Sequence, residues 1–145
     1  MSVGTYSAGE VILTVGNAVL SGFADGTFIS VERDEQSFTK VVGADGKVSR
    51  AKSNNRSGTL TVTLLDTSPS NDVLSEYLRA DEASNEGTFE IEMKDLSGRS
   101  RIFSAVGWVQ GMPTLEFAKE NSEREWVIEL GEMEFFIGGN TQVNS

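Results

Sequence analysis

The amino-acid sequence predicts a mainly β protein with one α-helix and one long arm between strands. The first observation is the alternation of apolar and polar side chains over short stretches, which places each kind on one face of a strand. The stretch Gly58–Leu65 shows this most clearly, because Leu60, Val62 and Leu64 share one face and threonines share the other. The second is the glycine-containing turn pairs that separate these stretches. The third is a single run of apolar residues at helical spacing.

Strands are expected along most of the chain. They span residues 11–15, 18–23, 27–33, 58–65, 88–94, 99–105, 126–130 and 133–137. A four-residue turn, 95–98, is expected to place Glu92 opposite Arg101 on the next strand, where the two side chains can form a cross-strand ion pair. A β-bulge at Gly131 is expected between the last two strands.

The helix is predicted over residues 69–80. Ser68 is a suitable N-cap, Pro69 suits the first helical position, and Arg79 would close the last turn. The apolar stripe at helical spacing consists of Val73, Leu74, Tyr77 and Leu78. The simplest interpretation is a helix that plugs one end of a β-sandwich or barrel.

The composition indicates a structural rather than a catalytic protein. The 145 residues include neither cysteine nor histidine, which excludes disulfides, thiolate metal sites and the Ser-His-Asp arrangement. The usual general base and the commonest metal ligand are therefore missing. No catalytic residue, cofactor or metal site is predicted. The length and a hydrophobic content of 38% are typical of one globular domain, here predicted to span residues 1–145.

Charge and hydropathy disfavour two further classes of protein. The start, Met1–Ser7, has neither a basic region nor an apolar core, so no signal peptide is expected. No run approaches the ~18 apolar residues of a membrane span, so no membrane insertion is expected. A net charge of −10 and a pI of about 4.4 disfavour general adhesion to nucleic acid. The polar end, residues 138–145, is expected to fray.

The segment from residue 38 to residue 58 concentrates positive charge. Its five basic residues, out of 12 in the chain, are Lys40, Lys47, Arg50, Lys52 and Arg56. Glutamates crowd residues 116–134 instead. A basic arm on an acidic body would let two copies attract head to tail although their net charges repel. Such a contact closes into rings or continues into filaments. A solvated hairpin without a partner is the open alternative, although Val41, Val42 and Val48 favour ordering against another surface.

Motifs that would indicate other functions are weak. The pairs Asp25-Gly26 and Asp45-Gly46 are typical of hairpin turns and lack the ligand spacing of a calcium loop. Two carboxylates on one strand face are too common to predict glycosidase chemistry. A carbohydrate-binding β-sandwich module that stacks a sugar on Trp108 or Trp126 remains an alternative from another class.

The order of elements resembles the tail tube proteins of contractile-tailed bacteriophages and their relatives in type VI secretion and pyocin tubes. The likeness is carried by the start Met1–Ser7, by Ser21–Arg33, by the arm ending Arg56–Leu64 and by the helix start Ser68–Asp72. It covers nearly the whole chain. It does not separate a phage tube from a secretion-system or pyocin-type tube.

The resemblance implies a β-sandwich or half-barrel of two antiparallel sheets with a flanking helix. Six copies would form a ring, and stacked rings would form a hollow tube that conducts the DNA genome during ejection. The arm, Lys40–Ser57, would reach the neighbouring ring. The tail sheath protein, the baseplate and the tail terminator are the implied partners. The implied location is the virion tail, after assembly in the cytoplasm of the bacterial host.

An acidic lumen would suit such a conduit. Double-stranded DNA carries about one negative charge per 1.7 Å of its axis, so a basic lumen would hold the genome while an acidic one lets it slide. DNA is therefore expected to pass without specific binding. The candidate lumen-facing acids are Glu90, Glu92 and Glu129.

Overall fold

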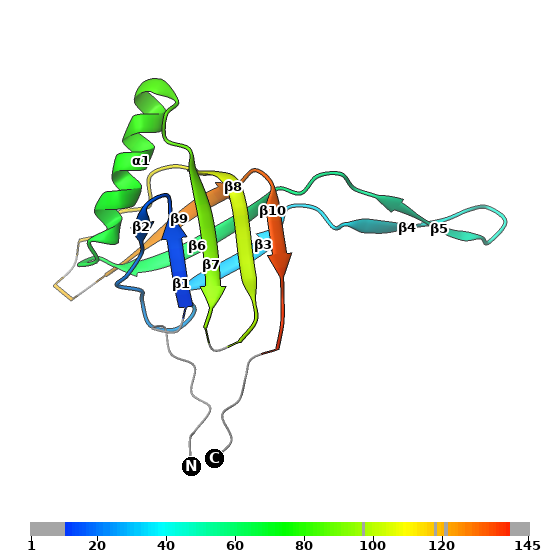
Figure 1. The fold of residues 1–145 in the computed structure, drawn as a ribbon, viewed down its shortest axis with the longest axis horizontal. Helices are drawn as coiled ribbons and strands as arrows, with labels where there is room; N and C mark the ends of the chain where they lie inside the picture. The colour runs from blue at the N-terminus through cyan, green and yellow to red at the C-terminus, as the bar shows by residue number, and fades with distance from the viewer. Residues whose placement is uncertain (1–10, 97, 118, 121, 140–145) are drawn as a thin grey trace, which may run out of the picture.

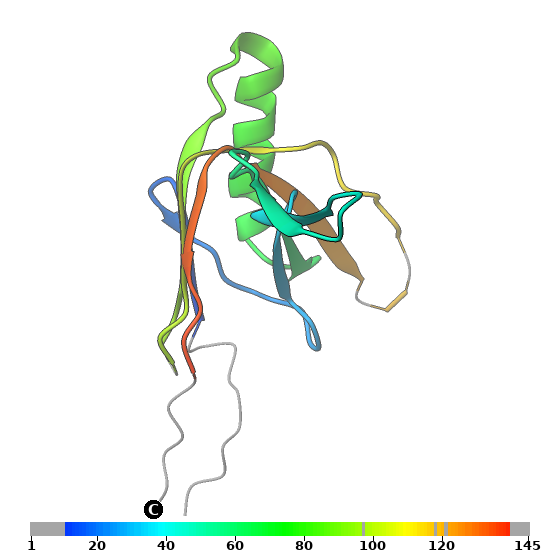
Figure 2. The ribbon, with the colours of Figure 1, turned by 90° about the vertical axis from the view of Figure 1, so that its right-hand side faces the viewer.

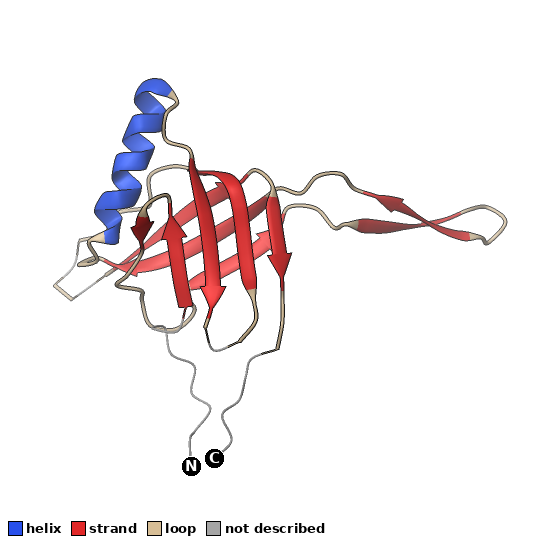
Figure 3. Cartoon of the chain, viewed as in Figure 1, coloured by secondary structure: helices blue, strands red, loops and turns tan. Residues whose placement is uncertain are grey.

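The computed structural model describes residues 11–139 except 97, 118 and 121, and it is rich in strands (Figures 1 and 3). Along the chain the elements are β1 (Val11–Val15), β2 (Ala18–Val19), β3 (Ile29–Arg33), β4 (Phe38–Val42), β5 (Val48–Lys52), β6 (Gly58–Leu65), α1 (Ser70–Ser84), β7 (Phe89–Asp95), β8 (Arg101–Val109), β9 (Glu123–Leu130) and β10 (Met133–Phe136). The predicted mainly β fold with one flanking helix is confirmed. The predicted terminal segments, Met1–Ser7 and residues from 140 onward, lie outside the described residues.

The body is an eight-stranded antiparallel sheet that bends into two layers (Figure 2). The strand order is β2-β1-β7-β8-β9-β6-β3, and β10 also pairs with β8. The beginning of β8 lies between β7 and β10, whereas its end, Gly107–Val109, pairs with β9. We call β2, β1, β7, β8 and β10 the β7 layer, and β9, β6 and β3 the β6 layer. The predicted half-barrel is thus one continuous sheet, and the second antiparallel sheet is the β4–β5 hairpin of the arm.

The core lies between the two layers. Burial alternates strictly along β6, as the sequence predicts for residues 58–65. The ring of Tyr77 on α1 packs against the ring of Phe89 at 4.8 Å between centroids. The indole Nε1 of Trp126 donates a hydrogen bond of 2.9 Å to Oδ1 of Asn71, so α1 is anchored to β9 as well as to β7. The helix therefore covers one end of the sandwich, as predicted.

Helix α1 is longer than the sequence predicts. It ends at Ser84 rather than near residue 80, and Asn85 adopts a left-handed conformation, with φ of 58°, that terminates it. The prediction stopped at the last apolar residue, although the following residues favour a helix. Arg79 is consequently not in the last turn and pairs with Glu76. At the start the prediction is also wrong, because the helix begins at Ser70 and its N-cap is Pro69, with no side-chain capping hydrogen bond. Ser68 lies one residue earlier, and its Oγ accepts a 3.2 Å hydrogen bond from the amide of Ser70.

Three strand predictions need correction. The expected strand 18–23 is only the two-residue β2, because Gly22 with φ of 72° breaks the extended chain. The turn after β7 is longer than predicted, so Lys94 rather than Glu92 lies opposite Arg101. Gly131 is not a bulge within a strand pair. It belongs to a bend between β9 and β10, where its amide donates to the carbonyl of Val106 at 2.8 Å.

Candidate assembly surfaces

The arm is an ordered hairpin that projects from the body (Figures 1 and 3). Strands β4 and β5 pair with each other and form a sheet of their own, and every residue in both is exposed. At the tip, the amide of Gly43 donates to the carbonyl of Lys47 at 2.8 Å. Gly46 has a φ of 83°, which favours glycine in this turn. The predicted arm loop 38–58 is therefore a two-stranded ribbon for most of its length.

The ribbon has two chemically different faces, because residues opposite each other in an antiparallel pair point to the same side. The pairs Phe38 with Lys52, Lys40 with Arg50 and Val42 with Val48 share one side. We call these six residues the basic face. The other side carries small or uncharged residues, namely Thr39, Val41, Ser49 and Ala51. All the cations of the two strands thus lie on one face, although Val41 is exposed on the other.

On the basic face the charges lie among exposed apolar side chains. The guanidinium carbon of Arg50 lies 4.3 Å from the centre of the Phe38 ring, a cation–π contact. Phe38, Val42 and Val48 are 46%, 59% and 66% exposed. Of the five predicted arm residues, Lys40, Arg50 and Lys52 therefore lie on one surface. Lys47 lies at the tip and Arg56 near the root.

The root of the arm is held to the body by polar contacts. The carboxylate of Asp34 accepts hydrogen bonds from Ser57 Oγ at 2.6 Å and from Thr59 Oγ1 at 2.8 Å. The Ser57 bond, and then the Thr59 bond, lower the pKa of Asp34 below its ordinary value. Arg33 donates to the carbonyl of Met133 at 2.7 Å and lies over the ring of Phe135. These contacts span the segments on both sides of the hairpin and orient it.

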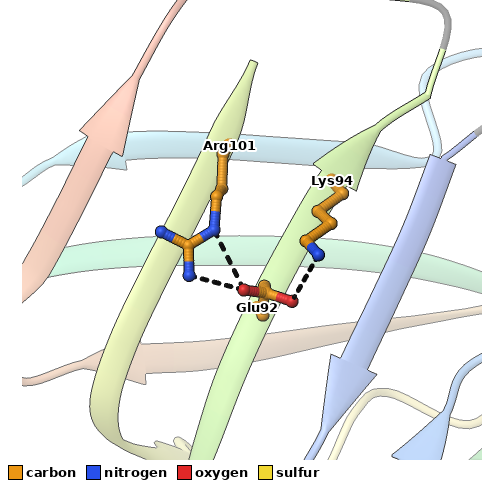
Figure 4. Close-up of polar contacts among 3 residues, drawn as sticks. All are labelled: Glu92, Lys94 and Arg101. Atoms are coloured by element: carbon orange, nitrogen blue, oxygen red, sulfur yellow. Dashed lines mark hydrogen bonds and ion pairs between the residues drawn. The ribbon is translucent and has the colours of Figure 1, made fainter. Parts of the chain in front are cut away.

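The outer face of the β7 layer carries Glu90 and Glu92, two of the predicted lumen acids. Arg101 Nη2 lies 2.6 Å from Glu92 Oε2, and Lys94 Nζ lies 3.6 Å from Glu92 Oε1 (Figure 4). The predicted Glu92–Arg101 ion pair is confirmed, although it forms diagonally between strands. The Arg101 hydrogen bond is the main reason why the pKa of Glu92 is lowered. Two cations therefore balance the negative charge of Glu92, whereas Glu90 is exposed.

Glu129 lies on the outer face of the other layer, so the structure does not bring the three predicted acids together. Residues on that face alternate along β9 and β6 with the buried residues of the core, and they include Thr59, Thr61 and Thr63. Its outward acids are Glu32, Glu123, Glu125 and Glu129. No lysine or arginine points outward from these three strands. Glu129 Oε1 accepts a hydrogen bond from Gln110 at 2.9 Å.

Sequence reasoning missed a groove on α1. Its apolar floor is formed by Val73, Tyr77 and Ala80, and its rim carries three carboxylates. These belong to Asp72, Glu76 and Glu86. The signal was available in part, because residues 72, 76 and 80 follow each other at the four-residue spacing that places side chains on one helix face. Glu86 joins them only because the chain turns back after Asn85.

The two tryptophans do not form an exposed sugar platform. Trp126 is 4% exposed and its indole nitrogen is occupied by Asn71. Trp108 is half-buried in β8. Within the described residues, no group of three or more His, Cys, Asp or Glu side chains could hold a metal ion. The described part of the chain also contains no helix long and apolar enough to cross a membrane.

The fold of this chain is similar to that of chains in two solved contractile injection systems. The chain has a TM-score of 0.63 at 10% identity to a chain of the sheath-tube complex of an extracellular contractile injection system, with 92% of each chain covered. It has a TM-score of 0.62 at 10% identity to a chain of the anti-feeding prophage tube-terminating cap, with 94% of each covered. At this identity the likeness shows the fold alone.

The family is shown by sequence. Residues 4–138 match the bacteriophage PhiTE tail tube protein family, and the chain belongs to that family. It is also 36% identical over 148 residues to structural protein ORF10 of Pseudomonas phage KPP10, covering 97% of this chain and 86% of that protein. The resemblance noted from the sequence is therefore confirmed. The chain is a structural subunit of the phage tail tube class and a component of the virion tail.

Proposed function

We propose that this subunit forms hexameric rings that stack into a hollow tube, and that the tube conducts the DNA genome during ejection. The observation that carries the proposal is the basic face of the arm. It exposes Phe38, Val42 and Val48 beside three cations, and within the described residues β4 and β5 pair only with each other. Such a surface gains most by docking on another copy, because burial removes apolar area from water.

The attachment of the arm supports a stacking role over a solvated hairpin. Asp34 joins the two flanking segments by accepting hydrogen bonds from Ser57 and Thr59, and Arg33 ties the root to β10 by donating to the carbonyl of Met133. A contact surface on a fixed ribbon loses less conformational entropy on docking than one on a free loop. The arm therefore serves as a pre-oriented connector from one ring to the next.

The proposed bore is lined by the outer face of the β6 layer. Short threonines and outward acids, with no cation among them, suit a surface along which DNA slides without being held. Of the three candidate acids, Glu129 lies on this face. Glu90 and Glu92 lie on the other layer, where Glu92 is paired with Arg101 and Lys94. The β7 layer also exposes Phe136 and Val19, which a contact between subunits would cover.

The proposed partners follow from the assembly. A sheath protein would surround the tube, and baseplate and terminator proteins would bind its ends. The solved structures with this fold include a tube-terminating cap and a sheath-tube complex. Assembly would take place in the cytoplasm of the bacterial host. A secretion-system or pyocin-type tube is the alternative, and the detection of DNA in the bore of ejecting particles decides between them.

Electron microscopy of the purified chain tests the proposal directly. Negative-stain images should show tubes with six-fold end views, and native mass spectrometry should detect hexamers at low concentration. A triple variant, with Lys47, Arg50 and Lys52 replaced by Glu, should stay folded or form rings but not tubes. Replacing Thr39, Ser49 and Ala51 by Glu is the control, since it adds acids to the opposite face of the ribbon.

The outcomes separate the parts of the proposal. A wild-type chain that stays monomeric at millimolar concentration contradicts tube formation. Normal tubes from the triple variant contradict the stacking role of the arm charges. End views of another symmetry contradict the hexamer but leave the arm in place.

A further inference from the structure

The groove on α1 is chemically complementary to the basic face of the arm. Its floor is apolar, and it is rimmed by the carboxylates of Asp72, Glu76 and Glu86. The basic face presents three cations among Phe38, Val42 and Val48. The apolar residues of the arm are exposed and those of the groove floor are half-buried, and each set lies beside charges of one sign, opposite between the two surfaces. Contact would bury both apolar surfaces while pairing the charges.

The spacing of the charges also matches. Residues two apart on a β-strand lie about 6.7 Å apart, which is the separation along the chain of Arg50 and Lys52. Residues four apart on an α-helix are separated by about 6 Å along the axis, which is the separation of Asp72 and Glu76. A strand lying along the helix can therefore place two successive cations beside two successive carboxylates.

The arm and helix α1, which carries the groove, lie on opposite sides of the body (Figure 1). A ribbon that projects away from its own α1 cannot occupy its own groove without refolding at the root, which Asp34 and Arg33 hold. The occupant must then come from another copy. Because donor and acceptor surfaces differ, the contact is head to tail and can be repeated from copy to copy.

We propose that the basic face of the arm docks into the α1 groove of an adjacent copy, a contact that rests on the proposed tube assembly and names the surface that receives the arm. Arg50 and Lys52 pair with two of the three groove carboxylates, namely Glu76 together with either Asp72 or Glu86. Phe38, Val42 and Val48 cover the floor of Val73, Tyr77 and Ala80.

A second acidic and apolar surface, the segment 112–117 after β8, is the main competitor. Met112 and Phe117 are 74% and 87% exposed, and Glu116 lies between them in the chain. The α1 groove differs in combining an apolar floor with three carboxylates on its rim. The experiment therefore includes it as a comparison.

Blocking the groove is the first test. Ala80→Arg places a long cation on the groove floor at a helix position that tolerates arginine. The matched control is Ala83→Arg, the same substitution on the same helix outside the groove. The critical concentration for tube formation, measured by sedimentation, should rise at least tenfold for Ala80→Arg and stay within about twofold for Ala83→Arg. Equal behaviour of the two variants overturns the proposal. Circular dichroism confirms that both remain folded.

Cysteine cross-linking gives a second readout that does not depend on a loss of assembly. The chain contains no cysteine, so an introduced pair is free of background disulfides. Val42→Cys combined with Ala80→Cys should give disulfide-linked ladders in oxidised tubes and none in dissociated protein. Val42→Cys combined with Phe117→Cys should give no ladder. The reverse pattern assigns the arm to the 112–117 segment and overturns the proposal.

The outcomes distinguish this inference from the tube assembly on which it rests. If Ala80→Arg forms normal tubes while the arm triple variant does not, the groove is excluded and the stacking arm stands. If the wild-type chain forms no tubes, the proposed function itself fails. If the Val42–Ala80 pair gives no ladder in oxidised tubes and a sheath protein instead protects Ala80→Cys from oxidation, the groove is a sheath site, which also overturns the proposal.

Discussion

Replacing Leu74 by alanine tests whether α1 is part of the core or an attachment to it. The Leu74 side chain is fully buried and belongs to the main hydrophobic cluster, together with Phe89 and Trp126. The substitution removes three carbon atoms from this site. At about 0.8 kcal/mol for each buried methylene, the lost transfer free energy is about 2.4 kcal/mol.

The void left behind adds to this cost. A cavity of about 60–80 Å³ that does not collapse costs about a further 1.5–2 kcal/mol, since each Å³ of cavity costs about 24 cal/mol. The surroundings of Leu74 include β-sheet residues that cannot move into the space without breaking strand pairing. We therefore expect the free energy of unfolding to fall by about 4 kcal/mol, within the range of about 2–5 kcal/mol seen for buried leucines.

Urea unfolding followed by circular dichroism measures this change. Leu74→Ala and its control are introduced into the arm triple variant, because tube assembly would add stability by mass action. The control is Val19→Ala at an exposed position of β2, where a change within about 0.5 kcal/mol is expected. A loss below about 1 kcal/mol for Leu74→Ala would refute the packing of α1 as a core element, and with it the rigid groove.

Further predictions concern the end of α1, the pH dependence and the ionic strength. Asn85→Gly should be nearly neutral and Asn85→Ala should lose about 1 kcal/mol by urea unfolding, because the φ of 58° disfavours residues with a Cβ. Gly87→Ala should lose about 1–3 kcal/mol in the same assay, since its Cβ would meet the carbonyl of Tyr77. The folded-state pKa values of Asp34 and Glu92 lie below their ordinary values of 3.8 and 4.5. Their contribution to the free energy of unfolding is therefore present above about pH 4.5 and is lost as the pH falls through their lowered folded-state pKa values. A free energy of unfolding that does not change as the pH falls below about 4.5 would contradict this prediction. Raising the salt from about 0.1 M to about 1 M shortens the Debye length from about 10 Å to about 3 Å, so the critical concentration for tube formation should rise. Light scattering measures this concentration. An unchanged value would assign stacking to apolar or β-edge contacts alone.

Local patterns predicted the elements well where the periodicity of apolar side chains decides the conformation. The alternation of β6 matched its observed bounds, Gly58–Leu65, because the two faces of that strand have different environments. The stripe around Leu74 placed the helix. Its end was placed too early, because continuation through residues 81–84 depends on helix propensity and on the left-handed Asn85 rather than on burial.

The charge pattern predicted the arm but not its geometry. Five basic residues within one segment were evident in the sequence, yet only the β4–β5 register shows that Lys40, Arg50 and Lys52 share a face. A register shifted by one residue would have split the three between opposite faces. In the same way, the longer turn after β7 moved Arg101 opposite Lys94, so the ion pair to Glu92 forms across a diagonal.

The sequence by itself determined the class of this protein: a β body, an amphipathic helix, a basic arm on an acidic chain, and the absence of histidine and cysteine for the usual catalytic chemistry. These features follow from periodicity and composition, which act within a few residues of chain. Tertiary structure alone decided which charges act together. It placed Glu129 and Glu92 on different layers and brought Glu86 beside Asp72 and Glu76. Such neighbours are set by strand register and by the bend at the end of β8, and these depend on contacts between residues far apart in the sequence.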